Sequence, residues 1–159
     1  MNGICATSWA RTSVCLLCKI TGGEIRPRSV NRVGTTDGVD SSFYTRDDFV
    51  DIRSSGLNAV RIPIGYWAVD VRDDEPYVSG QYPYLIQAVQ WAGELGLSVL
   101  IDLHGAPGSQ NGQDNSGLIG PVLFASNTSN ADRSLDVLRN LTQEFSRDVY
   151  GDVVNGRML

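Results

Sequence analysis

The stretch LSVLIDLHGAPGSQNGQDNSG, at residues 97–117, decides the fold of this chain. Its first part, residues 97–103, is a nearly continuous apolar run, which is typical of a strand buried on both faces in a parallel sheet. The only histidine of the sequence, His104, directly follows this run, and glycines and small polar residues come next. We therefore predict a central strand whose carboxyl end carries His104 and opens into a loop that can lie close against a ligand.

The junction that precedes this strand repeats an arrangement found 40 residues earlier. Gly96 ends a predicted helix and Leu97 opens the strand, as Gly56 and Leu57 do before a second apolar run. Repeated helix–strand units of this kind predict an α/β fold with a parallel sheet. A complete eight-unit barrel takes about 250 residues, whereas the chain has 159. Two interpretations follow from the residues: a short doubly wound domain, or part of a larger (β/α) barrel.

Local signals place the boundaries of these units. Thr45 with Asp48 is a variant of the capping box that begins a helix, and Pro83 suits the first position of the next helix. Pro63 marks the end of the first strand, because proline cannot donate to a sheet ladder. The predicted elements are helices at 45–56, 83–96 and 135–150, strands at 57–64 and 97–103, and loops at 65–82 and 104–130.

Composition excludes several classes of function. Apolar residues make up 42% of the sequence and charged residues 19%, which is ordinary for a globular domain. The net charge of −5 disfavours nucleic acid as a partner, because an acidic surface repels phosphates. No apolar run reaches the roughly 18 residues of a membrane-spanning helix. The loop after His104 also lacks the Gly-Lys-Ser/Thr ending and the GxGxxG spacing of phosphate-binding loops.

The cysteines give no metal or disulfide framework. There are three, Cys5, Cys15 and Cys18, and an odd number cannot close into pairs. Cys15 and Cys18 have the spacing of zinc ligands, but one histidine and no second CxxC pair leave a four-ligand set incomplete. We therefore expect no metal and no cofactor.

The first 40 residues differ from the rest. They show little periodicity and many Gly, Ser, Thr and Arg residues, so that we predict an irregular segment at 1–40 and a folded domain at 41–159. The apolar run SVCLLCKI is short and contains Lys19, so that no convincing signal peptide is present. Asn127 and Asn140 begin N-glycosylation sequons, which matter only in a secretory compartment.

Three polar residues stand near the carboxyl ends of the predicted strands, where α/β folds bind their ligands. Arg61 lies on the first strand, and Asp102 and His104 share one face of the second because they are two residues apart. A buried arginine needs an acceptor such as a carboxylate, and a histidine held at one nitrogen can donate to a hydroxyl with the other. The structural alternative stays open: His104 as a satisfied structural residue, Arg61 at an exposed strand end, and Asp102 as partner of a backbone amide.

Aromatic residues concentrate in the loop and helix start that follow the first strand. Their apolar faces and polar tips suit stacking on sugar rings, but such residues also cap hydrophobic cores, and both interpretations remain. They are Tyr66, Trp67, Tyr77, Tyr82 and Tyr84.

From about residue 41 to 155 the sequence closely resembles the fungal exo-β-1,3-glucanases of glycoside hydrolase family five. The resemblance is carried by GLNAVRIPIGYWAV, EPYVSGQYPYLIQAVQWAGELGLSVLIDLHGAPGSQNGQDNSG and VYGDVVNG, and the run IDLHGAPGSQNG is its most specific part. It implies a TIM barrel, of which this chain holds roughly the second and third strand units with flanking helices. It also implies retaining hydrolysis of β-glucan and an extracellular or cell-wall location.

The resemblance assigns roles to four residues. Arg61 matches the arginine that supports the family's nucleophilic glutamate, and His104 matches the histidine that contacts the sugar in the cleaved subsite. Asp114 and Asn115 fall in the loop that walls the same pocket, where they are expected to meet substrate hydroxyls. The implied partner is a β-glucan oligosaccharide or polysaccharide.

The sequence also departs from the family's pattern. The family's acid/base glutamate follows the fourth strand in an Asn-Glu-Pro motif and its nucleophile comes later, and the present sequence shows neither. Residues 1–40 lack the family's opening Gly-Val-Asn-Leu-Gly-Gly-Trp strand, and Gln113 stands where family members often carry phenylalanine. We therefore expect a truncated family member without turnover on its own. The alternative is a non-catalytic remnant that binds glucan or a protein, with self-association through exposed barrel edges.

Overall fold

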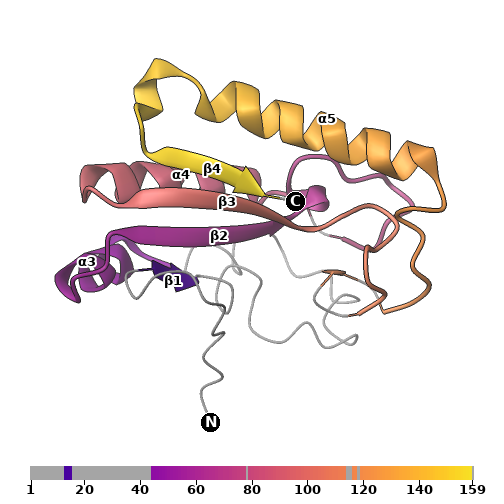
Figure 1. Cartoon of the computed structure of the whole chain (residues 1–159), viewed down its shortest axis with the longest axis horizontal. Helices are drawn as coiled ribbons and strands as arrows, with labels where there is room; N and C mark the ends of the chain where they lie inside the picture. Colours follow the sequence, from indigo (N-terminus) through magenta and orange to yellow (C-terminus); the bar gives the residue numbers. More distant parts are fainter. Residues whose placement is uncertain (1–12, 16–43, 78, 114–115, 118, 159) are drawn as a thin grey trace, which may run out of the picture.

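The computed structural model describes residues 13–15, 44–77, 79–113, 116–117 and 119–158. In these residues four parallel strands form one sheet in the order β1-β2-β3-β4 (Figure 1). The strands are β1 (Ser13–Cys15), β2 (Ala59–Gly65), β3 (Ser98–Gly105) and β4 (Val154–Met158). The helices are α3 (Arg46–Ser54), α4 (Tyr82–Glu94) and α5 (Thr128–Phe145), with short 3₁₀ helices η1 (Tyr66–Ala68) and η3 (Asp148–Tyr150).

Helices cross over between consecutive strands, α4 between β2 and β3 and α5 between β3 and β4. All strands point the same way, so that the loops after β2 and β3 leave from one end of the sheet (Figure 1). The described sheet is open, with β1 and β4 at its edges. This is the partial (β/α) barrel predicted from the sequence, with one more strand on either side of the predicted pair.

The predicted helix boundaries follow from their capping residues. Thr45 and Asp48 form the capping box at the start of α3, with the Thr45 backbone N–H donating to Asp48 Oδ2 at 2.8 Å. Gly56 and Gly96 follow α3 and α4 in left-handed conformations, with φ of +81° and +66°. Because a side chain is strained in that region, glycine is the residue that lets each helix turn into its strand.

Pro63 lies inside β2 and not at its end, which corrects the predicted boundary. It stands opposite Asp102 of β3, and the ladder continues to Gly65. Among the described residues β1 pairs only with Ala59–Arg61, so that the missing N–H of Pro63 breaks no described bond on the β1 side. Proline is tolerated at a strand position whose backbone N–H is not needed for a ladder hydrogen bond.

The third helix begins earlier than predicted. It starts at Thr128, and the side chain of Asn127 accepts a hydrogen bond from the Ser129 backbone N–H at 3.0 Å. Asparagine is one of the strongest N-cap residues. The apolar spacing that predicted a start at 135 missed residues 128–134 because they are polar or small, although Arg133 and Ser134 among them are buried.

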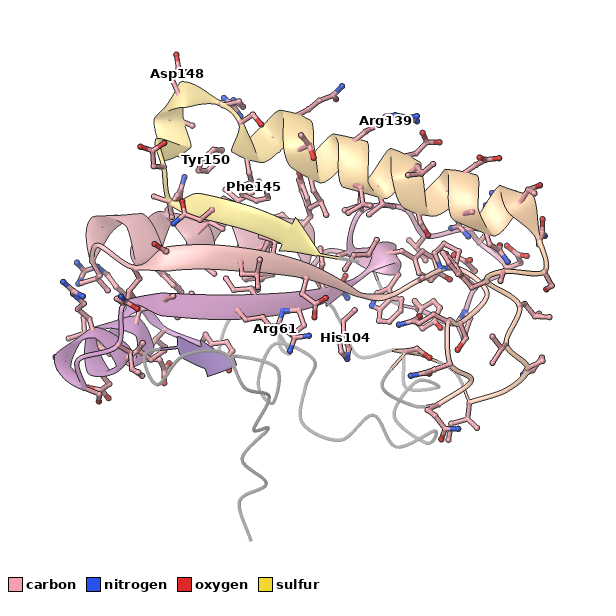
Figure 2. All side chains as sticks on the ribbon, in the orientation of Figure 1. Arg61, His104, Arg139, Phe145, Asp148 and Tyr150 are labelled. Carbon is pink, nitrogen blue, oxygen red and sulfur yellow. The ribbon has the colours of Figure 1, made fainter. Side chains whose placement is uncertain are left out.

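The core lies on one face of the sheet, where β2 and β3 meet the helices. Alternate residues of both strands are buried there, and the helices add Phe49, Val89 and Val137, each at most 1% exposed. Phe145 of α5 and Tyr150 of η3 pack ring against ring, with centroids 5.0 Å apart, where the chain turns toward β4 (Figure 2). The buried strand residues are Val60, Ile62, Ile64, Val99, Ile101 and Leu103.

Among the helices of the described residues, none combines the length and the apolar character that a membrane span requires.

Of the segment at 1–40, the structure describes only Ser13–Cys15. These residues form β1 and pair in parallel with Ala59–Arg61 of β2. Cys5 and Cys18 lie outside the described residues, as does the boundary near residue 41. The division into an irregular segment and a domain therefore stays a prediction.

We expect Ile101→Ala to lower the free energy of unfolding by about 3 kcal/mol, because it leaves a cavity in the centre of the sheet. Ile101 is 0% exposed, whereas Leu135 on α5 is 50% exposed. Leu135→Ala is the matched control and should change stability by less than about 0.5 kcal/mol. Urea unfolding of both variants measures the difference, and equal losses would contradict the placement of the core.

Candidate functional site

One carboxylate joins the two strands at the candidate site. Asp102 Oδ2 accepts a hydrogen bond from Arg61 Nη2 and lies 2.9 Å from His104 Nδ1. Arg61 Nη2 and His104 Nδ1 are 3.3 Å apart. The cluster forms because Arg61 pairs with Leu100 in the ladder, which puts Asp102 and His104 on the same face as Arg61. Figure 2 shows Arg61 and His104 projecting together on the side of the sheet away from α5.

The cluster is buried at its centre and open at its rim. The Asp102 side chain is 5% exposed, whereas those of Arg61 and His104 are 25% and 27% exposed. A buried carboxylate must be paired with cations or hydrogen-bond donors to offset its lost hydration, and Arg61 and His104 meet this need. Parts of both partners therefore face solvent. His104 lies next to the last residue of β3, whereas Arg61 is the third residue of β2 and reaches the cluster through its long side chain.

The contact with Asp102 sets the tautomer of His104. Nδ1 lies nearer to Asp102 Oδ2, which only accepts hydrogen bonds, at 2.9 Å than to Arg61 Nη2, which only donates them, at 3.3 Å, so that we expect Nδ1 to carry the proton. A neutral ring then presents Nε2 as an acceptor, which suits a sugar hydroxyl acting as donor. For Nε2 to donate to a hydroxyl, which is the role considered from the sequence, the ring would have to carry a proton on both nitrogens.

The loop after β3 is held by its own side chains, which sequence reasoning missed. Gln110 spans the backbone at the strand end, with Nε2 donating to the His104 carbonyl and Oε1 accepting from Ala106 N–H at 3.0 Å. Ser116 Oγ lies 2.7 Å from Ser109 Oγ and donates to Asn111 Oδ1 at 2.5 Å. The small polar residues that stood out in the sequence thus fold the loop onto itself. Asp114 and Asn115, the other two predicted site residues, lie outside the described residues.

A second polar network holds the loop after β2 against α5. Arg133 of α5 makes a two-pronged contact with Glu75, with Nη1–Oε1 and Nη2–Oε2 distances of 2.6 and 2.9 Å. Its Nε also donates to Asp70, and its guanidinium lies 4.8 Å from the centroid of the Tyr66 ring. Arg133 is 8% exposed. Sequence analysis missed this network because its partners are 58 and 63 positions apart.

The network shifts two pKa values in opposite directions. Burial alone raises the pKa of Glu75, but hydrogen bonds from Arg133, the Arg72 backbone and Tyr66 outweigh it and lower the value to about 2. Burial, together with the hydrogen bond to the Glu75 carboxylate, raises the pKa of Tyr66 well above its usual value. Tyr66 O–H therefore stays a donor to Glu75, at 2.7 Å.

The aromatic residues of this region pack on the core. Tyr66 is 3% exposed and belongs to the buried cluster, against which Trp67, Tyr77 and Tyr82 also pack. Trp67 and Tyr77 stack on one another at 4.1 Å between centroids. The core-capping interpretation therefore holds for these four residues.

Across the described residues, no group of three His, Cys, Asp or Glu side chains is placed to hold a metal ion.

Comparisons with known proteins identify the family of this chain. Residues 21–149 match a family model described as Cellulase (glycosyl hydrolase family 5). Glucan 1,3-beta-glucosidase of Kluyveromyces lactis is 54% identical over 117 residues, which are 73% of this chain and 27% of that relative. Glucan 1,3-beta-glucosidase 1 of Schizosaccharomyces pombe is 50% identical over 116 residues, 73% of this chain and 28% of that relative. The chain thus spans about a quarter of the length of these relatives.

A solved structure supports the fold. The crystal structure of a rutinosidase from Aspergillus niger matches with a TM-score of 0.69 and 21% identity, over 73% of this chain and 33% of that chain. The sheet with its crossover helices, together with the family model, places this chain in the class of (β/α)-barrel glycoside hydrolases. The chain belongs to the cellulase family, glycosyl hydrolase family 5.

The single histidine makes the tautomer of His104 directly measurable. At an alkaline pH where imidazole is neutral, long-range ¹H–¹⁵N correlation spectra should show the proton on Nδ1, because Asp102 accepts from it. Asp102→Asn should move population toward the Nε2–H form, because the amide of asparagine can donate as well as accept and therefore does not require a proton on Nδ1. A wild-type ring with the proton on Nε2 would contradict the geometry of the cluster.

Glu75 should make stability depend on acid pH. A carboxyl whose folded-state pKa is lowered contributes stability above its unfolded pKa and loses it as pH falls through the folded value. The change from 4.5 to about 2 corresponds to on the order of 3 kcal/mol. Wild type should therefore exceed Glu75→Gln in unfolding free energy at neutral pH, and the difference should shrink between about pH 5 and pH 2.

The control for this acid effect is Glu94→Gln. Glu94 pairs with Arg46 on the surface, where both side chains are at least 50% exposed. Such a pair contributes about 1 kcal/mol at most. Urea unfolding across the pH series separates the two variants, and a Glu75→Gln difference that does not change with pH would refute the assignment.

Proposed function

We propose that this chain contributes part of a β-glucan-binding site to a retaining exo-β-1,3-glucanase architecture. The observation that carries the proposal is the Arg61–Asp102–His104 cluster, which β2 and β3 present on one face of the sheet. Arginine and histidine held by a buried carboxylate offer directional hydrogen-bonding groups at a rim that stays open to a ligand. Sugar hydroxyls, which both donate and accept, are matched by an Nε2 acceptor beside guanidinium donors.

Each predicted residue has a role in this proposal. Arg61 supports the carboxylate that acts as nucleophile in the complete architecture, and His104 accepts from a hydroxyl of the bound sugar. Asp114 and Asn115 contact further hydroxyls from the loop after β3. The names of the relatives from Kluyveromyces lactis and Schizosaccharomyces pombe support a β-1,3-glucan substrate, and with it an extracellular or cell-wall location.

We further propose that this chain alone has no hydrolytic turnover. Retaining glycosidases use two carboxyl groups about 5–5.5 Å apart, one as acid/base and one as nucleophile. Asp102 is already bound to Arg61 and His104. The glutamates of the described residues pair with arginines instead: Glu75 with Arg133, Glu94 with Arg46 and Glu144 with Arg147.

A non-catalytic binding function is the second candidate. The described sheet ends in the two edge strands β1 and β4, and strand edges carry backbone groups that can pair with another chain. This favours self-association or capture of a partner strand. Size-exclusion chromatography separates a monomer from such an assembly.

The turnover proposal is tested with laminarin. The purified chain should release no more glucose than His104→Ala, because each glutamate of the described residues is paired with an arginine and none is placed to donate a proton or attack the anomeric carbon. Glucose release above that of the variant would contradict the proposal.

The binding proposal is tested with laminaritriose. We expect His104→Ala to weaken binding by about ten-fold in titration calorimetry, because one directional hydrogen bond is lost. Arg139→Met is the matched control, since this arginine is 68% exposed on α5 and contacts Asp136. Figure 2 shows it on the outer side of that helix. Equal affinities of wild type and His104→Ala would refute the assigned role.

A further inference from the structure

The Arg133 network continues into two stacked aromatic side chains, Trp67 and Tyr77, which reach the candidate site and are called the aromatic strut below. Trp67 lies in η1, two residues after the last residue of β2, and packs over the ends of two strands. A Cβ built on Gly65 would fall 2.2 Å from the indole, and one built on Gly105 would fall 2.7 Å from it. These glycines therefore leave the space that the indole occupies. Because Gly105 follows His104, the indole lies against the backbone that carries the histidine.

Tyr77 extends the strut to the far side of the loop after β3. Its ring stacks on Trp67 at an interplanar angle of 5°. A Cβ on Gly117 would fall 2.4 Å from the Tyr77 hydroxyl, so that the tyrosine closely approaches this part of the loop. The Trp67–Tyr77 pair thus contacts the loop at its start, next to Gly105, and near its middle, at Gly117.

Glu75 connects this strut to α5, since it lies two residues before Tyr77 and is held by Arg133. Glu75 Oε1 also accepts from Tyr66, whose ring packs edge-on against Trp67 and Tyr77 with centroids 5.3 and 5.6 Å away. The guanidinium fixes Glu75 by two parallel hydrogen bonds, which restrain orientation as well as distance. An apolar residue at 133 would fill the same space without that direction.

We propose that Arg133 is a positioning residue for the sugar site: through Glu75 and the Trp67–Tyr77 strut it holds the loop after β3 and the strand end that carries His104. The link to sugar rests on the proposed function, whereas the link to the loop does not. Asp70, which lies with Glu75 in the loop after β2, also binds Arg133. Its side chain accepts from Arg133 Nε, and its carbonyl accepts from Arg133 Nη2 at 3.1 Å.

Amide hydrogen exchange of the whole chain without ligand tests the mechanical link. In Arg133→Met, residues 105–113 should exchange about ten-fold faster than in wild type, while the central residues of β3 keep their protection. Arg139→Met should change neither, because it removes an exposed arginine from the same helix. A merely structural role would instead accelerate the loop and the central strand together.

Two further variants keep the test decisive. Glu75→Gln is isosteric and should accelerate the same loop residues, so that it replaces Arg133→Met if that variant does not fold. Arg133→Lys should give intermediate exchange, because lysine keeps the charge but cannot make the two-pronged contact. Loop exchange equal to wild type in both Arg133→Met and Glu75→Gln, or acceleration shared with β3, would overturn the proposal.

Laminaritriose titration then tests the link to the sugar. Arg133→Met should bind the trisaccharide about ten-fold more weakly than wild type, and the double variant with Glu75→Gln should be no weaker, because both changes break one connection. Unchanged affinity in Arg133→Met, with faster loop exchange, would overturn the positioning role at the site. If wild type itself does not bind the trisaccharide, the proposed function and the sugar link fail together, and the loop exchange still decides the mechanical link.

Discussion

The sharing of one buried carboxylate between two strands is the constraint on which the candidate site depends. Asp102 accepts from Arg61 and from His104 while only 5% of its side chain is exposed. A slip of one residue in the β2–β3 register would turn Arg61 to the opposite face and leave this carboxylate with one partner fewer. The register thus determines both the folding of the central strands and the direction in which Arg61 and His104 point.

The two faces of the sheet have different roles. The face toward the helices is sealed by apolar side chains such as Ile62 and Ile101, which are 0% exposed. The other face carries the charged cluster, whose desolvation is offset by its internal hydrogen bonds. Because the apolar face fixes the position of the strands, the polar face can hold charged groups partly open to a ligand without loosening the sheet.

What could be predicted from the sequence was local or face-specific. The apolar run of β3, the Thr45 capping box and the glycines at 56 and 96 each act within a few residues, so that the pattern alone indicated the units. Strand alternation predicted that Asp102 and His104 share one face, whereas the pairing of Asp102 with Arg61 depends on the register between β2 and β3. The Arg133–Glu75 contact could not be predicted this way, because no local pattern reports which loop a helix will touch. Pro63 gave a wrong strand end for a related reason. Whether a strand can continue through a proline depends on how far the neighbouring strand, here β1, extends beside it.

Nuclear magnetic resonance titration of the His104 ring with laminaritriose tests the central claim most directly. The account predicts a concentration-dependent shift of the Nε2 resonance, with Nδ1 much less affected because Asp102 already holds it. A ring whose two nitrogens do not respond, while resonances of α5 or of the sheet edges shift, would show that the sugar binds elsewhere and that the cluster is purely structural.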